Sequence, residues 1–539
     1  MTTRRPDHHH VPLPATAPSS FTATTVDVVA APGDGPHLLH RAARRLCDAA
    51  GPHAVLGQSA GELTVQLAPD LHAAMFVSTE MRRDTAGTSL LRLTLRLSGS
   101  AASRPEDSLD RWAEIWHRQP LSVQESERVA GELPLMSAAV DRLREGKPLA
   151  GFAVLVTGHF LTDLVHLVAC LAELGAPLDA MTVLRKDYAY QWRHRVHGHL
   201  DALGVHVTDA TDARAVAEHT ARARSKGLRC LALDDGGYVV PALLDQGRHE
   251  VVPGSAVGDW AGVVEQTMSG IYKLQGREEE LPFPVFSVAQ SRLKGRIESY
   301  WIAEKAVTTA LELLPALKIE GQPALVIGYG NVGAHIAALL TQRRMRVAVY
   351  DADILHLIEA HESGYTTARA LGPLLTRHEP LLVFGVTGRT SMSTREYAAL
   401  RRSVYLASVS SRDIEFDLPA LEAAATQEPA ARPVTHPAYR THALPGGVDV
   451  TVLAGGRPVN FHETDSISNL HSDLVYAGML TGACALATRP APPGLDPAWA
   501  DAVLDASGLL HDYYERYGPG SPAGSDPAAR PGPAEGYEQ

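Results

Sequence analysis

The stretch from Ala324 to Asp351 constrains the fold of this chain more tightly than any other part of the sequence. It opens with the apolar run Ala-Leu-Val-Ile, which is typical of a strand buried on both faces of a parallel sheet. Gly328, Gly330 and Gly333 follow as G-x-G-x-x-G. In this arrangement the first glycine permits a tight turn, the second lets a phosphate approach the backbone, and the third packs a helix against the strand.

The segment after the glycines completes a βαβ unit. Ala334 to Leu340 predicts a helix whose N-terminal N–H groups and dipole face a phosphate. Val347 to Tyr350 predicts a second strand that ends on Asp351, a carboxylate that can accept hydrogen bonds from both ribose hydroxyls. The pattern predicts a dinucleotide site, and a glycine turn in a plain α/β unit is the alternative. Because Asp351 would repel a 2′-phosphate, NAD is expected rather than NADP.

Composition and charge exclude several classes of protein. The chain has 539 residues, which suggests two or three domains. Its formal charge of −12 argues against a general nucleic-acid or membrane-surface role, because there is no basic surplus to neutralise phosphates. Four cysteines lie far apart without a CxxC motif, so neither a disulfide framework nor a zinc site is indicated, and no metal site is expected. Without a signal-peptide pattern or an apolar run long enough to span a bilayer, a cytoplasmic location is expected.

The expected fold class is α/β, with a Rossmann NAD-binding domain, a second α/β substrate domain and a small α+β N-terminal domain. The expected divisions are a disordered leader (1–20), the α+β accessory domain (21–108), the substrate-binding domain (109–290), the NAD-binding Rossmann domain (291–465), a segment returning to the substrate domain (466–490), and a C-terminal helix with a disordered tail (491–539).

The accessory domain contains no chemical motif. Its pattern predicts a strand over Thr25–Ala30 and a helix over His37–Ala50. Three strands with alternating faces are predicted over Glu62–Leu67, Ala74–Ser78 and Leu90–Leu97. A docking or dimerisation module is the expected role, and residues 101–108 are expected to form a linker.

The substrate domain brings polar residues to the ends of predicted strands. Strands are expected at Phe152–Thr157, Ala180–Leu184 and Cys230–Leu233, with helices at Leu161–Leu174 and His194–Leu203. Ligands of open α/β sheets bind at the carboxyl ends of such strands.

His159 follows the first of these strands and Asp235 follows the last, so both are candidates to face one crevice. A helix cap or a turn residue is the alternative interpretation for each of them.

Further elements are predicted in the rest of the chain outside the βαβ unit. Further α/β alternation is expected through Leu381–Val386 and Val404–Val409. The other predicted elements are a long helix at 296–313, a hairpin over Gly446–Gly456, a helix over His471–Leu486 and a short amphipathic helix over Pro497–Tyr514.

Several further stretches between about residues 135 and 488 match, in the same order, the sequence pattern of a known family. They are Lys147–Gly151, Leu233–Gly237, Gly262–Gly270, Pro284–Lys294, Gly328–Gly333, Thr387-Gly388, Asp413–Asp417 and Leu453–Asn460. Together they make the chain similar to the S-adenosylhomocysteine hydrolase family, in which the glycine loop is GYGDVG. The first hundred residues and the tail lie outside the resemblance.

The resemblance implies a specific chemistry. In this family, tightly held NAD oxidises the ribose 3′ carbon, a base then removes the 4′ proton, the 5′ substituent is eliminated, water adds, and the oxidation is reversed. The net reaction is hydrolysis of a thioether. Such a site needs a lysine at the 3′ hydroxyl and an acid/base near the 4′ and 5′ carbons.

The family's functional residues transfer to matching positions of this sequence. The implied catalytic residues are Lys294, Asp235, His159, His471 and Glu298. The implied substrate-binding residues are Gln266, Asp163 and Ser411. The implied cofactor-binding residues are Gly328, Gly330, Asn331, Val332, Gly333, Asp351, Thr267, Ser269, Thr387 and Asn460. His471 matches only if about four residues are inserted after Asn460, and otherwise Ile467 occupies that position.

The departures from the family fall on the substrate side. Gln266 replaces a glutamate, so it can hydrogen-bond a hydroxyl but cannot act as a base. Glu298 and Ser299 replace Asp-Asn, and Ser411 replaces the family's gate and catalytic histidine, with Arg412 in place of a phenylalanine.

On the adenine side, Leu161 replaces a threonine and Asp163 shortens a glutamate. The family's C-terminal lysine and tyrosine have no match in the Pro/Gly-rich tail.

These observations predict an NAD-dependent enzyme that oxidises, at least transiently, the 3′ hydroxyl of a nucleoside-like small molecule, with an altered substrate. The alternatives are a genuine adenosylhomocysteinase of one-carbon metabolism, a catalytically silent NAD-binding regulator, and a dehydrogenase that releases NADH. No nucleic-acid or membrane partner is expected, and a homo-oligomer is.

Overall fold

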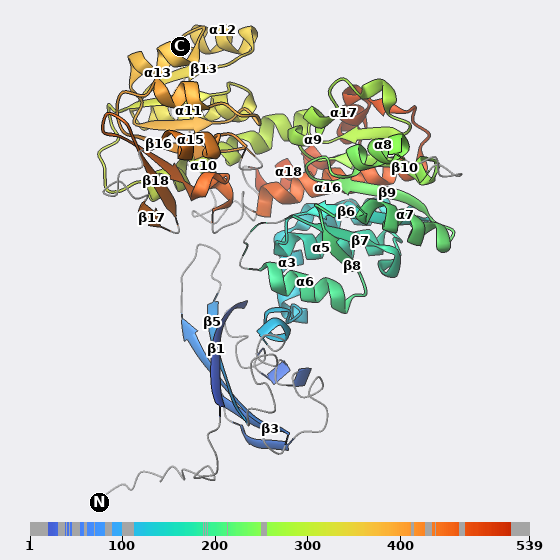
Figure 1. Ribbon diagram of the computed structural model, residues 1–539. Coiled ribbons are helices and arrows are strands. Elements are labelled where there is room, and N and C mark those ends of the chain that lie inside the picture. The colour runs from blue at the N-terminus through green and yellow to red at the C-terminus, as the bar shows by residue number, and fades with distance from the viewer. Residues whose placement is uncertain are drawn as a thin grey trace, which may run out of the picture. The chain divides into compact units, whose positions relative to one another are not determined.

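The computed structural model describes residues 113–249, 256–410, 414–425, 434–462 and 469–518, apart from 187, 189, 191, 213 and 437. It also describes the strands between residues 20 and 99 and five positions between 38 and 45. The chain divides into two compact units (Figure 1). Unit 1 comprises residues 1–125 and 191–199, and unit 2 comprises residues 126–190 and 200–539.

Unit 1 contains an antiparallel five-stranded sheet with the order β1-β5-β4-β3-β2. The strands are β1 (Ser20–Ala30), β2 (Ala54–Gln58), β3 (Glu62–Ala68), β4 (Leu71–Glu80) and β5 (Ser89–Gly99). The three strands predicted with alternating faces are confirmed as β3, β4 and β5, and the strand predicted from Thr25 begins earlier, at Ser20. Strand β2 was not predicted from the sequence.

Parts of the accessory domain lie outside the described residues. The described positions within the helix predicted over 37–50 are helical. The predicted linker at 101–108, the leader as far as residue 19 and the tail from residue 519 are not described.

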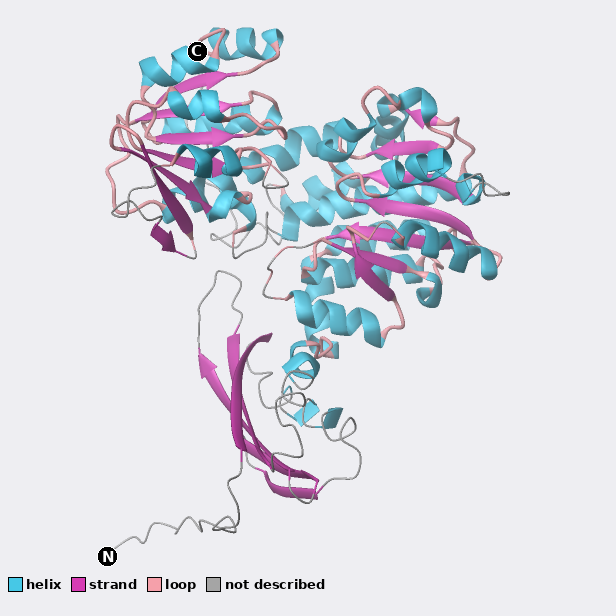
Figure 2. Ribbon diagram, viewed as in Figure 1, coloured by secondary structure: helices cyan, strands magenta, loops and turns pink. Residues whose placement is uncertain are grey.

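The first sheet of unit 2 has seven strands, all parallel, in the order β20-β11-β10-β9-β6-β7-β8. Its strands are β6 (Phe152–Gly158), β7 (Thr182–Arg185), β8 (His206–Asp209), β9 (Arg229–Asp234), β10 (Trp260–Glu265), β11 (Pro284–Ser287) and β20 (Gly494–Leu495). Helices cover both faces of this sheet (Figure 2). They include α5 (Thr162–Glu173), α7 (Ala215–Ser225), α8 (Val239–His249), α9 (Met268–Leu274) and α16 (Asn469–Thr488).

The second sheet of unit 2 has eight strands in the order β14-β13-β12-β15-β16-β19-β18-β17. The strands are β12 (Pro323–Ile327), β13 (Arg346–Tyr350), β14 (Thr366–Thr367), β15 (Leu382–Gly385), β16 (Val404–Ser408), β17 (Val434–His436), β18 (Tyr439–Leu444) and β19 (Val448–Leu453). The first six strands in this order, from β14 across to β19, are parallel to one another. The last two, β18 and β17, add an antiparallel edge.

The strand that opens the glycine motif lies inside this second sheet, between β13 and β15. All five residues of β12 are buried, as its apolar run predicts. The predicted helix after the glycines is α11 (Asn331–Gln342), and the strand ending next to Asp351 is β13. We call the part of unit 2 around the seven-stranded sheet the first lobe and the part around the eight-stranded sheet the second lobe. The remaining helices of the second lobe are α10 (Ser299–Leu313), α12 (Ile354–Glu362), α13 (Leu371–His378), α14 (Thr394–Ala398) and α15 (Leu418–Ala424).

Three predicted elements differ from the structure. The hairpin placed at Gly446–Gly456 is formed by β18 and β19, so its first strand precedes the glycines, and Gly446 and Gly447 take the positive φ angles of the turn. The helix predicted at 296–313 begins as a π-helical turn at Lys294–Glu298 and continues as α10.

The helix predicted over Pro497–Tyr514 is the third difference. It is two helices, α17 (Pro497–Ala506) and α18 (Leu509–Tyr517), separated where Gly508 adopts a φ of 80°. The helix predicted from His471 is confirmed as α16 with slightly wider bounds.

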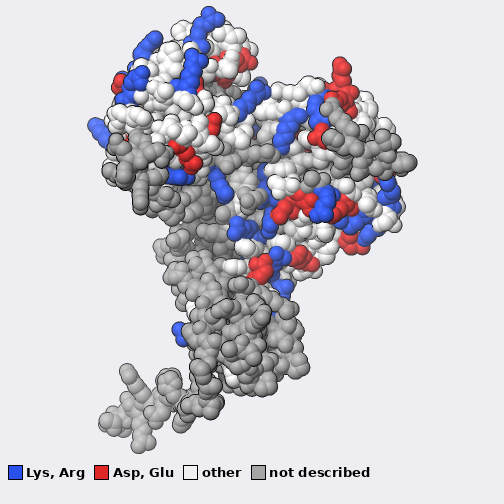
Figure 3. All heavy atoms as spheres, in the orientation of Figure 1, with Lys and Arg blue, Asp and Glu red and all other residues white. Residues whose placement is uncertain are grey.

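The described surface carries both signs of charge. Lysine and arginine side chains are interspersed with acidic ones over the face of unit 2 that Figure 3 shows. Among the described helices, none combines the length and the apolar character that crossing a bilayer requires.

Candidate functional site

Each sheet of unit 2 has one point where the order of its strands reverses direction. In the first sheet this point lies between β6 and β9, and in the second it lies between β12 and β15. Crevices outside the carboxyl ends of strands at such points are where open α/β sheets bind ligands. His159 and Asp235 follow β6 and β9, while Gly328 and Thr387 lie just beyond β12 and β15.

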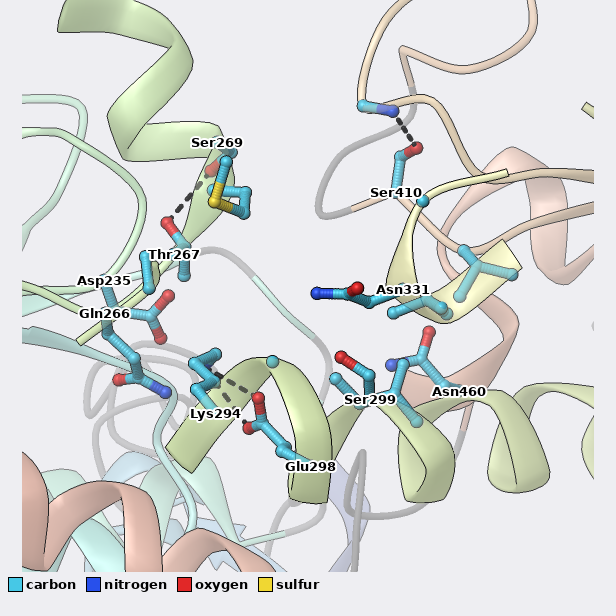
Figure 4. A pocket seen from close by; sticks show the side chains of 18 of the residues that line it. Asp235, Gln266, Thr267, Ser269, Lys294, Glu298, Ser299, Asn331, Ser410 and Asn460 are labelled. Carbon is cyan, nitrogen blue, oxygen red and sulfur yellow. Dashed lines mark hydrogen bonds and ion pairs between the residues drawn. The ribbon is translucent and has the colours of Figure 1, made fainter. Parts of the chain in front are cut away.

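A cavity of about 690 Å³ is lined by residues from both lobes of unit 2. In Figure 4, Asp235, Gln266 and Thr267 lie on one side of it and Asn331 and Asn460 on the other. Fourteen of the residues predicted from the sequence line this cavity. They are His159, Asp163, Asp235, Gln266, Thr267, Ser269, Lys294, Glu298, Gly330, Asn331, Val332, Gly333, Thr387 and Asn460.

The glycine loop has the geometry that its three glycines imply. Gly328 has a φ of 101°, and a Cβ there would lie 2.8 Å from the Val386 carbonyl oxygen. A Cβ on Gly333 would lie 1.9 Å from the Gly328 oxygen, so the helix can approach the strand only without a side chain. Gly330 has open space around its missing Cβ and lines the cavity. The loop therefore leaves room for a phosphate against the backbone at Gly330.

Asp351 is held in place by backbone N–H groups. Its Oδ2 accepts a hydrogen bond of 2.6 Å from Tyr329 N, and its Oδ1 accepts one of 2.8 Å from Asp353 N. His356 Nδ1 lies 3.3 Å from Oδ2. Two carboxylate oxygens offer more acceptor positions than these contacts use, so Asp351 can still receive ribose hydroxyls.

Asn460 supplies a further observation that fits a bound cofactor. Its Oδ1 is buried, and no hydrogen-bond partner for it lies within the described ranges. Since a buried carbonyl oxygen normally has a donor, this atom is suited to receive one from a ligand in the cavity. The open glycine, the fixed carboxylate and this amide oxygen together fit a dinucleotide.

Lys294 and Glu298 form an ion pair inside the cavity. The pair spans the π-helical turn, and Nζ lies 2.9 Å from Oε2 and 3.3 Å from Oε1 (Figure 4). Glu298 is buried, and its Oε2 contacts Nζ without hydrogen-bond geometry. That oxygen can therefore accept a hydrogen bond from a substrate hydroxyl. Single π-helical turns are frequent at functional sites, because they re-aim side chains.

His159 and Asp235 lie close together, with Nε2 and Oδ2 3.3 Å apart. Lys186, which was not predicted from the sequence, contacts both of them. Its Nζ is 2.9 Å from Asp235 Oδ1 and 3.0 Å from His159 Nε2. Tyr190 Oη lies 2.6 Å from His159 Nδ1 on the other side of the ring. Lys186 directly follows β7, so its place at a strand's carboxyl end was the signal that could have found it.

The electrostatics of this group follow from burial and two lysines. Burial lowers the pKa of His159 to about 3, with Lys186 and Lys294 acting in the same direction and Asp235 opposing them. Burial by itself would raise the pKa of Asp235, but the charge and hydrogen bond of Lys186, together with His159 and Lys294, outweigh it, and the pKa is lowered. At neutral pH the site therefore holds a neutral imidazole and a carboxylate.

A buried glutamate supports the loop that carries Asp235. Glu265 ends β10, and its carboxylate accepts from Thr267 N at 2.8 Å, from Gly237 N at 3.1 Å and from Gly236 N at 3.3 Å. Burial and the Asp234 carboxylate raise its pKa to about 8. Glu265 belongs to the Gly262–Gly270 stretch shared with the family, but no role for it was predicted from the sequence.

Glu415 plays the same structural part in the second lobe. It is fully buried, and its carboxylate accepts from Thr387 N at 3.1 Å, Thr387 Oγ1 at 2.8 Å and Gly388 N at 3.2 Å. A Cβ on Gly385 would lie 2.2 Å from Glu415 Cγ, so the strand end needs a glycine there. Burial raises the pKa of Glu415.

Four predicted site residues do not line the cavity in the described structure. Gly328 shapes the loop behind it, and Asp351 lies at the end of β13. Ser411 falls outside the described residues. The backbone of His471 lies in α16, and its side chain is not described. The roles of these residues, like those of the residues lining the cavity, stay predictions.

One cluster of potential metal ligands occurs in unit 1. Single ligand atoms of Glu114, His117 and His194 lie within 4.8 Å of one another. Arg118 donates to the Glu114 carboxylate, and Arg193 Nε donates to His194 Nε2 at 3.1 Å. Guanidinium groups therefore already contact two of the three potential ligands, and the expectation of no metal site stays a prediction.

Comparison with known proteins identifies the second lobe. Residues 301–466 match the family model for the NAD-binding domain of S-adenosyl-L-homocysteine hydrolase. This match agrees with the fit of a dinucleotide to the glycine loop, and the cofactor of the chain is NAD.

Individual relatives extend the similarity to the first lobe. The chain is 30% identical over 377 residues to an uncharacterized protein of Mycobacterium tuberculosis, which covers 65% of this chain and 68% of that protein. It is 25% identical over 410 residues to the adenosylhomocysteinase of Thermosynechococcus vestitus, covering 73% of this chain and 91% of the enzyme. The adenosylhomocysteinase of Thermotoga maritima is 25% identical over 365 residues, with 65% and 83% covered. The chain thus belongs to the S-adenosylhomocysteine hydrolase family, as a divergent member that carries the family's NAD-binding domain.

Proposed function

We propose that this protein is an NAD-dependent enzyme that transiently oxidises a ribose 3′ hydroxyl of a nucleoside-like substrate other than S-adenosylhomocysteine. Within this proposal, residues 109–290 form the substrate domain and residues 291–465 the NAD domain. Bound NAD would supply the redox chemistry, that is, the reversible oxidation of the carbinol carbon.

The observation that carries the proposal is the largely buried Lys294–Glu298 ion pair, with side chains 14% and 8% exposed, in the cavity that the glycine loop also lines. A cavity that only held a cofactor would not need a paired lysine and carboxylate inside it, because burying two charges is costly unless they are used. A lysine beside a carboxylate can take up and return the proton of a bound hydroxyl.

The chain's own residues suggest a division of labour. As a neutral amine, Lys294 Nζ would receive the hydroxyl proton, and Glu298 would stabilise the ammonium that forms and accept a hydrogen bond from the same sugar. Gln266 offers an amide to a ribose hydroxyl, because it can donate and accept but cannot remove a proton. Asp235 is an ionised carboxylate that also lines the cavity, and it is suited to remove the proton from the carbon next to the oxidised one.

The changed residues support an altered substrate. Leu161 and Asp163 both line the cavity and are 8% and 5% exposed. An apolar side chain where the family has a hydroxyl removes a hydrogen-bond partner, and a site that loses such a partner discriminates against the ligand that needs it. The base or base-equivalent of the substrate is therefore expected to differ from adenine in its hydrogen-bonding edge.

The test is a single-turnover measurement on purified protein with its bound NAD quantified. Adenosine, S-adenosylhomocysteine and a panel of nucleosides are added separately, and the absorbance of reduced nicotinamide is followed. We expect reduction by at least one nucleoside, with an amplitude that matches the bound NAD and with little response to S-adenosylhomocysteine. Protein with bound NAD that no nucleoside reduces would refute the proposal and favour a regulatory protein.

Lys294→Ala gives the matched test of the assigned role. We expect this variant to bind NAD like the wild type. The rate at which a nucleoside reduces the bound NAD should fall by at least about 100-fold, the lower end of a general acid–base contribution. Lys318→Ala is the control, because Lys318 is exposed on the loop before β12 and does not line the cavity. A Lys294→Ala variant as active as Lys318→Ala would remove the assignment.

A further inference from the structure

Lys186 is a buried lysine at the wall of the cavity. Its side chain is 3% exposed, and that of Asp235 is 5% exposed. Lys186 follows β7, whereas Asp235 follows β9 and His159 follows β6, so three neighbouring strands bring the three side chains together. A lysine so deeply buried keeps its charge only when its partners compensate for lost hydration.

The donors and acceptors around Lys186 fix the proton on His159. An ammonium group carries three donors and no acceptor. Its 3.0 Å contact with His159 Nε2 therefore requires Nε2 to accept. The proton of a neutral imidazole must then lie on Nδ1, which donates to Tyr190 Oη at 2.6 Å. The opposite tautomer would direct two donors at each other along the Lys186 contact.

Within the described part of the chain, the charged groups that face His159 are Lys186, Lys294 and Asp235. Two of the three are cations, and the ring is also buried against aromatic side chains. Phe461 stacks on it at a centroid distance of 4.7 Å, and Tyr188 meets it edge-on at 4.8 Å. Burial and the two ammonium groups oppose a positive charge on the ring, whereas only Asp235 favours it.

We infer that Lys186 is a positioning residue of this pocket, whose ammonium holds His159 as the neutral Nδ1–H tautomer and Asp235 as a carboxylate. The Nε2 lone pair of His159 is then engaged by Lys186, so His159 is not the free base of the resting site. Asp235 is then the general base of the resting site. The exchangeable protons that lie closest to both His159 and Asp235 are those on Lys186 Nζ. The inference about the tautomer of His159 is independent of the proposed function. The catalytic role of Asp235 rests on the proposed function.

The direct test is nitrogen NMR of the full-length, NAD-bound protein with isotope-labelled histidine. The signals of His159 are identified by their loss in His159→Asn. We expect a protonated Nδ1 and an unprotonated Nε2 at neutral pH, unchanged down to about pH 5. An Nε2–H tautomer, or an imidazolium at pH 6 to 7, would overturn the inference without any further variant.

Removal of the ammonium tests its cause. In Lys186→Met, Asp235 becomes the dominant charge beside His159, so we expect the imidazole to titrate at least roughly one pH unit higher than in the wild type. Lys186→Arg keeps the charge and is expected to restore part of the wild-type behaviour. Lys226→Met is the matched control, because Lys226 pairs with Asp179 in a more exposed ion pair. Unchanged His159 titration in Lys186→Met would refute the electrostatic role.

Two readouts separate this inference from a purely structural role and from the proposed function. NAD binding and the thermal midpoint of each variant show whether it folds. If Lys186→Met does not fold, Lys186→Gln takes its place, because glutamine donates a hydrogen bond without carrying a charge. The NMR measurement needs no substrate, so it decides the inference even if no nucleoside reduces the NAD. Where a nucleoside does, Lys186→Met should move the acidic limb of the rate profile to higher pH, and an unmoved limb would contradict the catalytic consequence.

Discussion

Gly330→Ala should weaken cofactor binding without destabilising the fold, whereas Gly333→Ala should destabilise the fold. Both glycines belong to the same loop and lie three residues apart. No heavy atom lies within 4 Å of the position where Gly330→Ala would place its Cβ, and Gly330 has a φ of −71°, which alanine adopts freely. Gly333→Ala would place its Cβ 1.9 Å from the Gly328 carbonyl oxygen.

The expected magnitudes follow from these distances. Gly333→Ala needs a backbone shift of more than an ångström to reach ordinary contact at 3.4 Å, so we expect it to lower the free energy of unfolding by about 3 kcal/mol, the upper end of the overpacking range. Gly330→Ala should leave that free energy unchanged or raise it by about 0.4–1 kcal/mol, because the unfolded chain loses freedom. Its Cβ points into the space proposed for the pyrophosphate, so NAD should bind at least about tenfold more weakly, or about 1.4 kcal/mol.

The assay combines urea unfolding of NAD-free protein with an NAD titration of each variant. Unfolding without cofactor is essential, since bound NAD would itself stabilise the folded state. Gly330→Ala that binds NAD like the wild type would refute the placement of the pyrophosphate at this loop. Gly333→Ala that unfolds like the wild type would refute the close contact between α11 and β12.

Three further predictions concern single side chains. Asp351→Ala should weaken NAD binding by roughly 10- to 100-fold, since it loses charge-assisted hydrogen bonds to the ribose, and should improve relative binding of NADP; unchanged affinity in a titration would show that another residue holds the ribose. Arg195→Met should lower the free energy of unfolding by about 3–5 kcal/mol, because it leaves the buried Glu125 carboxylate without its two 2.6 Å contacts, and a loss below about 1 kcal/mol in urea would contradict this. Burial lowers the pKa of His219 from 6.5 to about 4, so the unfolded chain binds a proton that the folded chain does not, and stability should fall as pH drops through this range; His219→Gln should flatten that dependence in pH-dependent melts, and an equally steep dependence would exclude His219 as a cause.

The sequence alone determined the elements whose signals are local. The apolar run of β12, the glycines after it and the acid after β13 all lie within 28 residues, and each reflects a local requirement for burial, backbone conformation or charge. The same holds for the alternating strands β3, β4 and β5. Local pattern did less well where two helices share one apolar periodicity, so the break at Gly508 between α17 and α18 was missed.

Only the tertiary structure showed that Lys186 meets His159 and Asp235 at the wall of the cavity. His159, Lys186 and Asp235 are separated by 27 and 49 residues, and each follows a different strand. Their contact depends on β6 lying between β7 and β9, an order that hydrophobic periodicity does not encode because periodicity records which face of a strand is buried and not which strands are neighbours. Lys186 therefore looked like an ordinary residue at a strand end, and it was the pairing of three parallel strands that placed its ammonium between an imidazole and a carboxylate.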